Sequence, residues 1–325
     1  MKLTVSSRVG AAIAHAAVAH LAERLGLRLP PEARPGADLW VRAVDGLPWP
    51  APAPLLPTAD GWVHPGPPTA WSSFTEMVLA LGALPRRDPA AATFPDLRSL
   101  TAETLDAEAG AWMLPAVAVR AAPARPAPIP APADTDVTGA KVVVLGTAWA
   151  TPLVGMVLAR LGARVMRVEH PDRPDPFPLH GRLLRGQERV ALDLGRPAER
   201  DRFAALLADA DLLVDGHTPR VLANADLAHT TLSAVAPRLS ILRVAALADD
   251  DRPGYGPAAE ARGGWAARHD PPRLGRSSLA DPVAALIGAL TAVDVLTGRG
   301  PGARARVSLE GAVGHLLATE AGSGA

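Results

Sequence analysis

The stretch GAKVVVLGTAWATPLVGMVLARLGARVMRVEHP, residues 139–171, decides the fold. A short apolar run rich in valine opens it, apolar residues at helical spacing follow, and a second short run with apolar residues closes it. Runs of these lengths and periods are typical of a strand, a helix and a strand in succession. The stretch therefore predicts a βαβ unit.

The same alternation continues downstream of this unit. Further strands are expected at RVALDL, DLLVDG and LSILRVAAL, with helices at AERDRFAALLADA and near residues 229–236 between them. Strands that alternate with helices usually form a parallel sheet covered by helices. The predicted fold class is therefore α/β, with a Rossmann-like, mostly parallel sheet domain.

The sequence before this region has a different texture. Residues 120–136, RAAPARPAPIPAPADTD, carry prolines at almost every second position, which favours an extended linker. Upstream we expect an Ala-rich helix at about 8–26, a hairpin turn at Asp60-Gly61, and helices in AWSSFTEMVLALGALP and LTAETLDAEAGAWML. The chain is thus divided into a smaller helical or mixed domain at 1–119, the linker at 120–136, and the sheet domain at 137–325.

Composition excludes several classes of function. The 325 residues include 33 Lys and Arg against 33 Asp and Glu, so no overall field attracts nucleic acid or an anionic membrane. Without cysteine there is no disulfide, thiolate nucleophile or cysteine-ligated metal, and the nine histidines form no HxxxH pair. His15 and His20 interrupt the apolar stretch near the N-terminus, which argues against a leader peptide. We expect a soluble, cytoplasmic protein without a metal.

Ligands of open α/β sheets bind at the carboxyl ends of the strands, here the loops after Leu145, Val168 and Val214. Neither GxGxxG nor GxxxxGK[ST] occurs there, which disfavours a nicotinamide, flavin or nucleoside triphosphate.

Six pieces in order carry a family resemblance: residues 139–171, RVALDL, ADLLVDGHTPRVL, GYGP, LADP and LTGRGPGARARVSLEGAV. Over residues 138–318 the chain resembles the amino-terminal half of class III (CaiB/BaiF) CoA-transferases, the family of formyl-CoA and carnitine CoA-transferases and 2-methylacyl-CoA racemase. The segment before the linker resembles that family's smaller domain, which normally follows the sheet domain. Its position in front resembles a rearranged actinobacterial group.

Asp281, in LADP, has two interpretations. An Asp followed by Pro and by apolar positions 283, 286, 287, 290 and 293 is typical of a helix N-cap. The resemblance instead implies that Asp281 is a nucleophile, which takes CoA from an acyl-CoA donor as an aspartyl-CoA thioester and passes it to a carboxylic acid. Both roles can coexist. Gly263 and Gly264 lie where the family has a glycine loop whose amides could stabilise an oxyanion.

The resemblance also implies a binding site for CoA, as a substrate and not as a permanently bound cofactor. It falls on Trp149, Ala150, His170, Gly216, His217 and Thr218. The family's cationic positions are missing, because residues 185–188 read Arg-Gly-Gln-Glu and a phosphate-facing arginine falls on Asn224. Arg182, Arg185 or Arg220 are the candidates to compensate, since arginine binds phosphate by a fork of donors.

Two alternatives stay open. The first is racemisation, in which His269-Asp270 would act with Asp281 as the acid-base pair. The second is a non-catalytic homologue that serves as a partner subunit. The family forms dimers, so a homodimer is expected.

Overall fold

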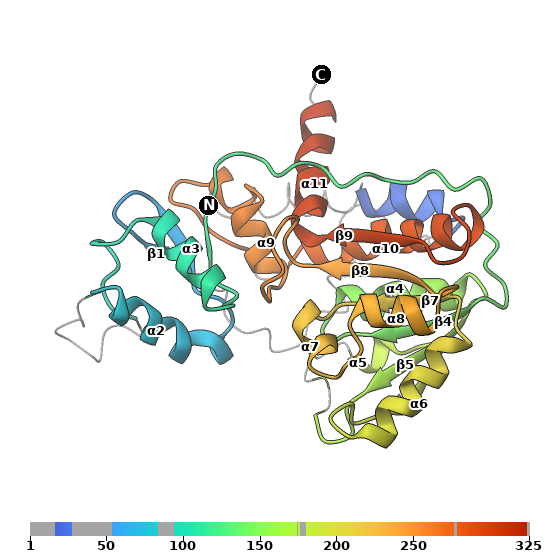
Figure 1. The fold of residues 1–325 in the computed structure, drawn as a ribbon. Coiled ribbons are helices and arrows are strands. Elements are labelled where there is room, and N and C mark those ends of the chain that lie inside the picture. Colours follow the sequence, from blue (N-terminus) through green and yellow to red (C-terminus); the bar gives the residue numbers. More distant parts are fainter. Residues whose placement is uncertain are drawn as a thin grey trace. The chain divides into compact units, whose positions relative to one another are not determined.

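The main sheet has six parallel strands in the order β6-β5-β4-β7-β8-β9 (Figure 1). The computed structural model describes residues 17–27, 54–83, 94–173, 175, 180–275 and 278–323. The strands are β4 (Lys141–Leu145), β5 (Arg164–Glu169), β6 (Gln187–Ala191), β7 (Leu212–Asp215), β8 (Ser240–Ala245) and β9 (Arg304–Ser308). The first five confirm the predicted strands and the parallel sheet. No strand was predicted at β9, because arginines alternate along its exposed first half.

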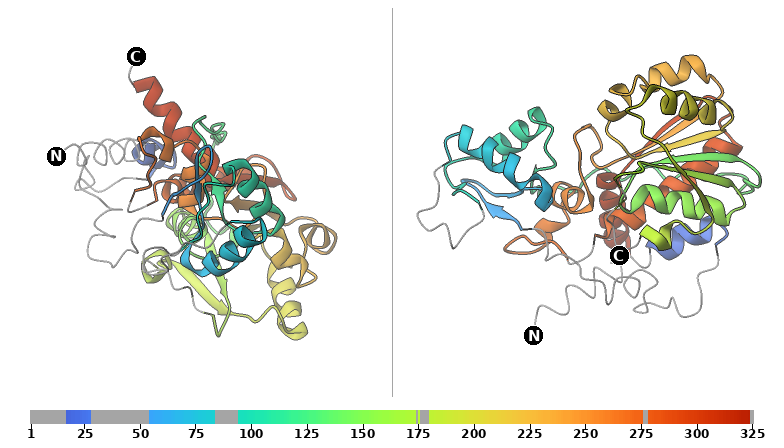
Figure 2. Two further views of the ribbon diagram at one scale, coloured as in Figure 1. Left: turned by 90° about the vertical axis from the view of Figure 1, so that its left-hand side faces the viewer. Right: turned by 90° about the horizontal axis from the view of Figure 1, so that it is seen from below.

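Helices cover both faces of this sheet. Helix α4 (Ala150–Arg160) and helix α10 (Ala280–Thr297) lie on one face, where a Cβ at Gly288 of α10 would be 3.0 Å from Cγ2 of Val154 in α4. Figure 2 shows a second set of helices on the opposite face of the sheet. These are α6 (Pro197–Ala208), α7 (Pro219–Ala223) and α8 (His229–Val235), while the short α5 (His180–Leu183) precedes β6.

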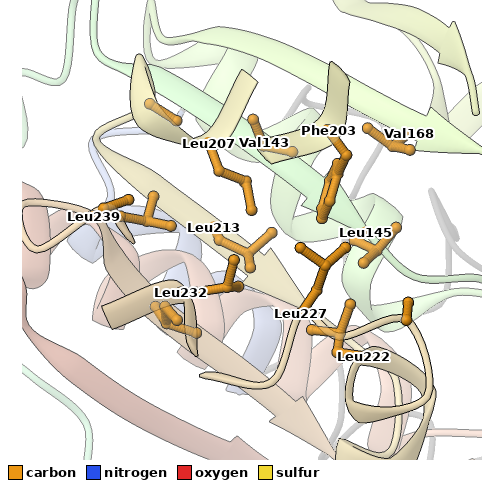
Figure 3. Close-up of a cluster of buried hydrophobic side chains, with 14 of the residues drawn as sticks. Val143, Leu145, Val168, Phe203, Leu207, Leu213, Leu222, Leu227, Leu232 and Leu239 are labelled. Atoms are coloured by element: carbon orange, nitrogen blue, oxygen red, sulfur yellow. The ribbon is translucent and has the colours of Figure 1, made fainter. Parts of the chain in front are cut away.

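The core between the sheet and α6, α7 and α8 follows from alternation along the strands. Figure 3 shows Phe203, Leu207 and Leu232 packed against the side chains that β4 and β7 present to this face, such as Val143 and Leu213. Alternate strand residues point to opposite faces, so both faces are apolar, as a sheet covered on both sides requires.

Helix α10 is buried along most of its length. It is the one helix within the described residues that is long and apolar enough to cross a membrane, and 83% of that window is buried inside the protein. A helix that is apolar all round is typical of a protein core as well as of a membrane.

A second group of elements includes a small antiparallel sheet. Its strands are β1 (Leu56–Pro57), β2 (Trp62–His64) and β3 (Val117–Ala118), in that order. The turn at Asp60-Gly61 is confirmed, because Thr58 N donates to Gly61 O at 2.9 Å between β1 and β2. The helices are η1 (Pro68–Ala70), α2 (Trp71–Ala80), α3 (Ala102–Ala111), α9 (Gly256–Arg262), η2 (Ala266–Arg268) and α11 (Leu309–Ser323). Helices α2 and α3 confirm the two helical patterns predicted there.

The chain folds into two units that interleave along the sequence. The sheet unit combines residues 1–47, 127–245 and 281–308, and the smaller unit combines 48–126, 246–280 and 309–325. Residues 120–136 form neither helix nor strand, and the boundary between units falls within them, at 126/127. The division into consecutive domains at 1–119 and 137–325 stays a prediction.

Of the helix predicted at about 8–26, residues 17–24 are helical and residues 8–16 lie outside the described part of the chain.

Candidate functional site

The loops after β4 and β7 meet at the centre of the sheet. These strands are neighbours, with Leu145 paired to Asp215. The chain leaves β4 for a helix on one face and leaves β7 for helices on the opposite face, which makes this edge a topological switch point. Ligands of open α/β sheets bind at such a point. Trp149, Ala150, Gly216, His217 and Thr218 all follow these two strands.

Glycine is required where the two loops touch. A Cβ at Gly216 would lie 2.2 Å from Oγ1 of Thr151 in α4, and the amide of Gly216 donates to Leu145 O at 2.8 Å. A side chain at position 216 would therefore push the two loops apart.

Trp149 and Ala150 are placed at this edge, but their side chains are buried. Trp149 is the N-cap residue of α4 and only 3% exposed, and Ala150 is 6% exposed. A tryptophan buried to this extent is typical of packing within the protein and not of a ring that stacks on a ligand. The preceding Ala148 has a left-handed φ of 65°, and its amide donates to Oδ2 of Asp175 at 2.8 Å. Within this loop Thr147 is exposed, whereas Trp149 and Ala150 are buried.

His170 follows β5, with both ring nitrogens facing neighbours. Its Nε2 lies 3.4 Å from Oδ1 of Asp193, and its Nδ1 accepts from the amide of Asp172 at 3.1 Å. The Gly195 amide, with smaller contributions from His170 and Arg196, holds the pKa of Asp193 below its usual value. A phosphate at His170 would have to compete with these partners.

His217 shares a buried carboxylate with a residue that the sequence did not single out. Asp215, at the end of β7, accepts from the amide of His217 at 3.0 Å and lies 3.0 Å from Nε2 of His229, the first residue of α8. Nδ1 of His217 is 3.4 Å away, an ion-pair distance without hydrogen-bond alignment. Burial opposes ionisation of Asp215, but these partners outweigh it and lower its pKa. Asp215 stays charged and ties the loop to α8.

Asp281 lies in the first turn of α10 and is 8% exposed. Helix α10 leads directly into β9, which is parallel to β8, so α10 runs back across the sheet from the carboxyl edge to the amino edge. Its first turn therefore lies at the carboxyl edge, on the face that also carries α4. The topology brings Asp281 to the same edge as the loops after β4 and β7.

The start of α10 differs from the predicted one, in which Asp281 is the N-cap. Helix α10 begins two residues earlier than predicted, at Ala280 and not at Pro282. The amides of Leu279 and Ala280 donate to Oε1 of Glu260, at 2.6 and 3.3 Å. These are among the first amides of the helix, which have no acceptor within it, so Glu260 satisfies part of the start of α10.

Gly263 and Gly264 lie in the smaller unit and have a packing reason to be glycine. A Cβ on Gly263 would be 2.7 Å from Ala259 O, and Gly264 has a φ of 93°. The amide of Gly263 donates to that same carbonyl at 2.7 Å. This amide is therefore engaged within α9.

The positions considered for phosphate binding are dispersed. Arg185 and Arg220 are exposed, and the side chain of Arg182 lies outside the described residues. Gln187, within the segment that departs from the family's cationic pattern, donates to Pro152 O at 3.0 Å. Gln187 thus supports α4 from β6.

Sequence reasoning missed Asp215, His229 and Glu260. Asp215 ends a clear strand, which was a usable signal, but its bond to His229 depends on where α8 packs. Glu260 sits in a short Ala-rich helix, and no local pattern connects it to the start of α10.

An open six-stranded parallel sheet with candidate ligand loops at its switch point defines a Rossmann-like α/β protein. Residues 137–323, more than half of the chain, match the profile of CoA-transferase family III. The chain belongs to this family.

Similar proteins were found by sequence and by structure. The chain is 30% identical over 177 residues to the succinyl-CoA–D-citramalate CoA-transferase of Chloroflexus aurantiacus. The alignment covers 48% of this chain and 44% of that protein. It is 30% identical over 188 residues to the succinyl-CoA–L-malate CoA-transferase beta subunit of that organism, covering 50% and 46%. The chain spans just under half the length of these relatives. A hypothetical protein of Mycobacterium tuberculosis (Rv3272) superposes with a TM-score of 0.51 at 22% identity, over 57% of this chain and 59% of the other, which shows a shared fold.

Proposed function

We propose that the protein transfers CoA from an acyl-CoA donor to a carboxylic acid through an aspartyl-CoA thioester on Asp281. The observation that carries the proposal is the position of Asp281. It is a carboxylate at the carboxyl edge of the sheet, within the segment that matches CoA-transferase family III. Support also comes from relatives that are themselves named CoA-transferases.

The chemistry requires a carboxylate and a pocket. An oxygen of Asp281 attacks the thioester carbonyl of the donor, which gives a mixed anhydride and CoA thiolate. The thiolate attacks the Asp281 carbonyl, forms the aspartyl-CoA thioester and releases the donor acid as a carboxylate. The acceptor carboxylate then attacks this thioester, and the returning thiolate forms the new acyl-CoA. Asp281 is regenerated, and no net proton, water or electron is consumed.

The pantetheine arm of CoA would run past the loops at the switch point toward Asp281. The exposed Gly216 and the half-buried His217 and Thr218 are the side of this edge that a ligand can reach, while Trp149 and Ala150 would contribute backbone. We propose CoA and acyl-CoA as substrates, with no permanently bound cofactor and no metal.

Assembly and location belong to the same proposal. The chain covers about half of its relatives, and one relative is named as a beta subunit and another as an alpha subunit. We propose a cytoplasmic protein that works as a homodimer or with a partner subunit that completes the site.

The test is incubation with a panel of acyl-CoA donors, followed by hydroxylamine trapping and intact-mass measurement. A trapped adduct together with CoA transfer to an added acid supports the proposal. If calorimetry detects no CoA binding at millimolar concentration, the proposal is wrong and the protein is better described as a non-catalytic partner subunit.

A racemase would behave differently in the same assay. Burial, together with Arg273 and Arg268, lowers the pKa of His269, which favours the neutral imidazole that a general base needs. A racemase would exchange the alpha proton of the substrate for deuterium without a covalent enzyme-CoA species. Exchange without an adduct would therefore favour that alternative.

A further inference from the structure

Glu260 places a buried carboxylate at the start of α10. It lies in α9, is 2% exposed, and its Oε1 accepts from the hydroxyl of Ser278 at 2.9 Å. The same oxygen accepts from the amides of Leu279 and Ala280, at 2.6 and 3.3 Å. Three donors from consecutive residues thus converge on one oxygen.

These donors lie at the N-terminal end of α10. The first amides of a helix have no acceptor within the helix, and a negative charge at that end is favourable. In α10 the acceptor for the first amides is supplied by a residue of another helix. Because Asp281 follows Ala280 directly, the backbone that carries Asp281 is held by Glu260.

We propose that Glu260 is a positioning residue for Asp281. It fixes the backbone from which the Asp281 carboxylate projects, and it takes no covalent part in the transfer. This role rests on the proposed function of Asp281 as the nucleophile. A misplacement of about 1 Å at a reacting group can cost on the order of a hundredfold in rate, so the contact should affect kcat rather than substrate affinity.

Glu310 offers a matched control in the same unit. It is also buried, at 6% exposure, and its Oε2 accepts from the amide of Ala248 at 2.9 Å. Its partner amide does not adjoin Asp281. Loss of either carboxylate should destabilise the fold, but only loss of Glu260 should disturb the transfer step.

The experiment compares Glu260→Ala, Glu260→Gln and Glu310→Ala in the full chain, by kcat, the KM for acyl-CoA, Tm and amide exchange at Leu279 and Ala280. We expect Glu260→Ala to lower kcat about a hundredfold, with KM changed less than about threefold and faster exchange at both amides. Glu260→Gln should recover most of the rate, because an amide oxygen accepts the same bonds. Glu310→Ala should lower Tm and keep kcat within about threefold.

Ser278→Ala covers the case in which Glu260→Ala does not fold, since it removes one of the three donors and should lower kcat by about threefold to tenfold. The role of Glu260 is overturned if folded Glu260→Ala or Ser278→Ala keeps the wild-type kcat, or if Glu310→Ala loses as much. A wild-type chain with neither transfer nor a trapped adduct overturns the proposed function itself, and the role of Glu260 with it.

Discussion

Oγ1 of Thr151 lies 2.2 Å from the position that a Cβ would occupy at Gly216. Thr151 is β-branched and buried in the first turn of α4, so it has little freedom to move aside. We expect Gly216→Ala to lower the free energy of unfolding by about 1–3 kcal/mol and to weaken CoA binding. Gly181→Ala is the matched control, because its Cβ would meet nothing within 4 Å. Equal effects of the two substitutions in urea denaturation and CoA titration would show that this contact is unimportant.

Asp215 should make the protein sensitive to acid. Its pKa is lowered in the folded state, so its contribution to stability is complete above the unfolded pKa and is lost as pH falls through the folded pKa. At pH 7 we expect Asp215→Asn to cost about 2–3 kcal/mol. Asp209→Asn, which breaks the exposed pair of Asp209 with Lys141, should cost less than about 0.5 kcal/mol.

The difference between wild type and Asp215→Asn should shrink as pH is lowered below about 4. Denaturation series at several pH values measure it. A difference that stays constant down to pH 2 would mean that folding does not lower the pKa of Asp215.

His64 should lower stability in mild acid. Burial outweighs its contact with Pro54 O and lowers its pKa to about 4. Between pH 4 and 6.5 the unfolded chain therefore binds more protons at this residue than the folded chain does. The contribution of neutral His64 to the free energy of unfolding is complete above pH 6.5 and is lost as pH falls toward 4. The slope is at most about 1.4 kcal/mol per pH unit. His64→Phe keeps a ring of similar size and should flatten this part of the profile; parallel profiles would contradict the assignment.

Arg252 should be essential to the smaller unit. It is 5% exposed and bonds Oδ1 of Asp106 at 2.9 Å, Oδ2 of Asp250 at 2.7 Å, and two backbone carbonyls. Arg252→Met leaves these carboxylates and carbonyls without their donor, and we expect a cost of about 3–5 kcal/mol. Arg98→Met removes an exposed ion pair and should cost less than about 0.5 kcal/mol. Thermal unfolding of both variants measures the two losses in unfolding free energy. Equal losses would contradict the view that burial makes the Arg252 contacts stronger than the exposed pair of Arg98.

The sheet could be predicted because its signals are local. The valine-rich run at residues 142–144 and the apolar run at residues 212–214 of β7 each identify a buried strand without reference to the rest of the chain. The start of α10 was predicted to within two residues for the same reason, since LADP precedes a continuous apolar helix.

The remaining features depend on long-range packing. Arg252 meets a carboxylate that is 146 residues away in sequence, and Glu260 meets amides about 20 residues away. No local pattern indicates either partner. The interleaving of the two units arises from such contacts, and a linear reading of composition favours consecutive domains.

The most direct test of the central claim is the intact mass of the protein after incubation with an acyl-CoA donor, for wild type and Asp281→Asn. Asparagine keeps the hydrogen-bonding capacity of an N-cap but cannot form the thioester, and Glu260 supplies part of the cap. We expect a hydroxylamine-sensitive CoA adduct on the wild-type peptide that contains Asp281. Asp281→Asn should give no adduct and no transfer, at a nearly unchanged Tm. Full transferase activity in Asp281→Asn would contradict the account and leave Asp281 as a residue of the helix start alone.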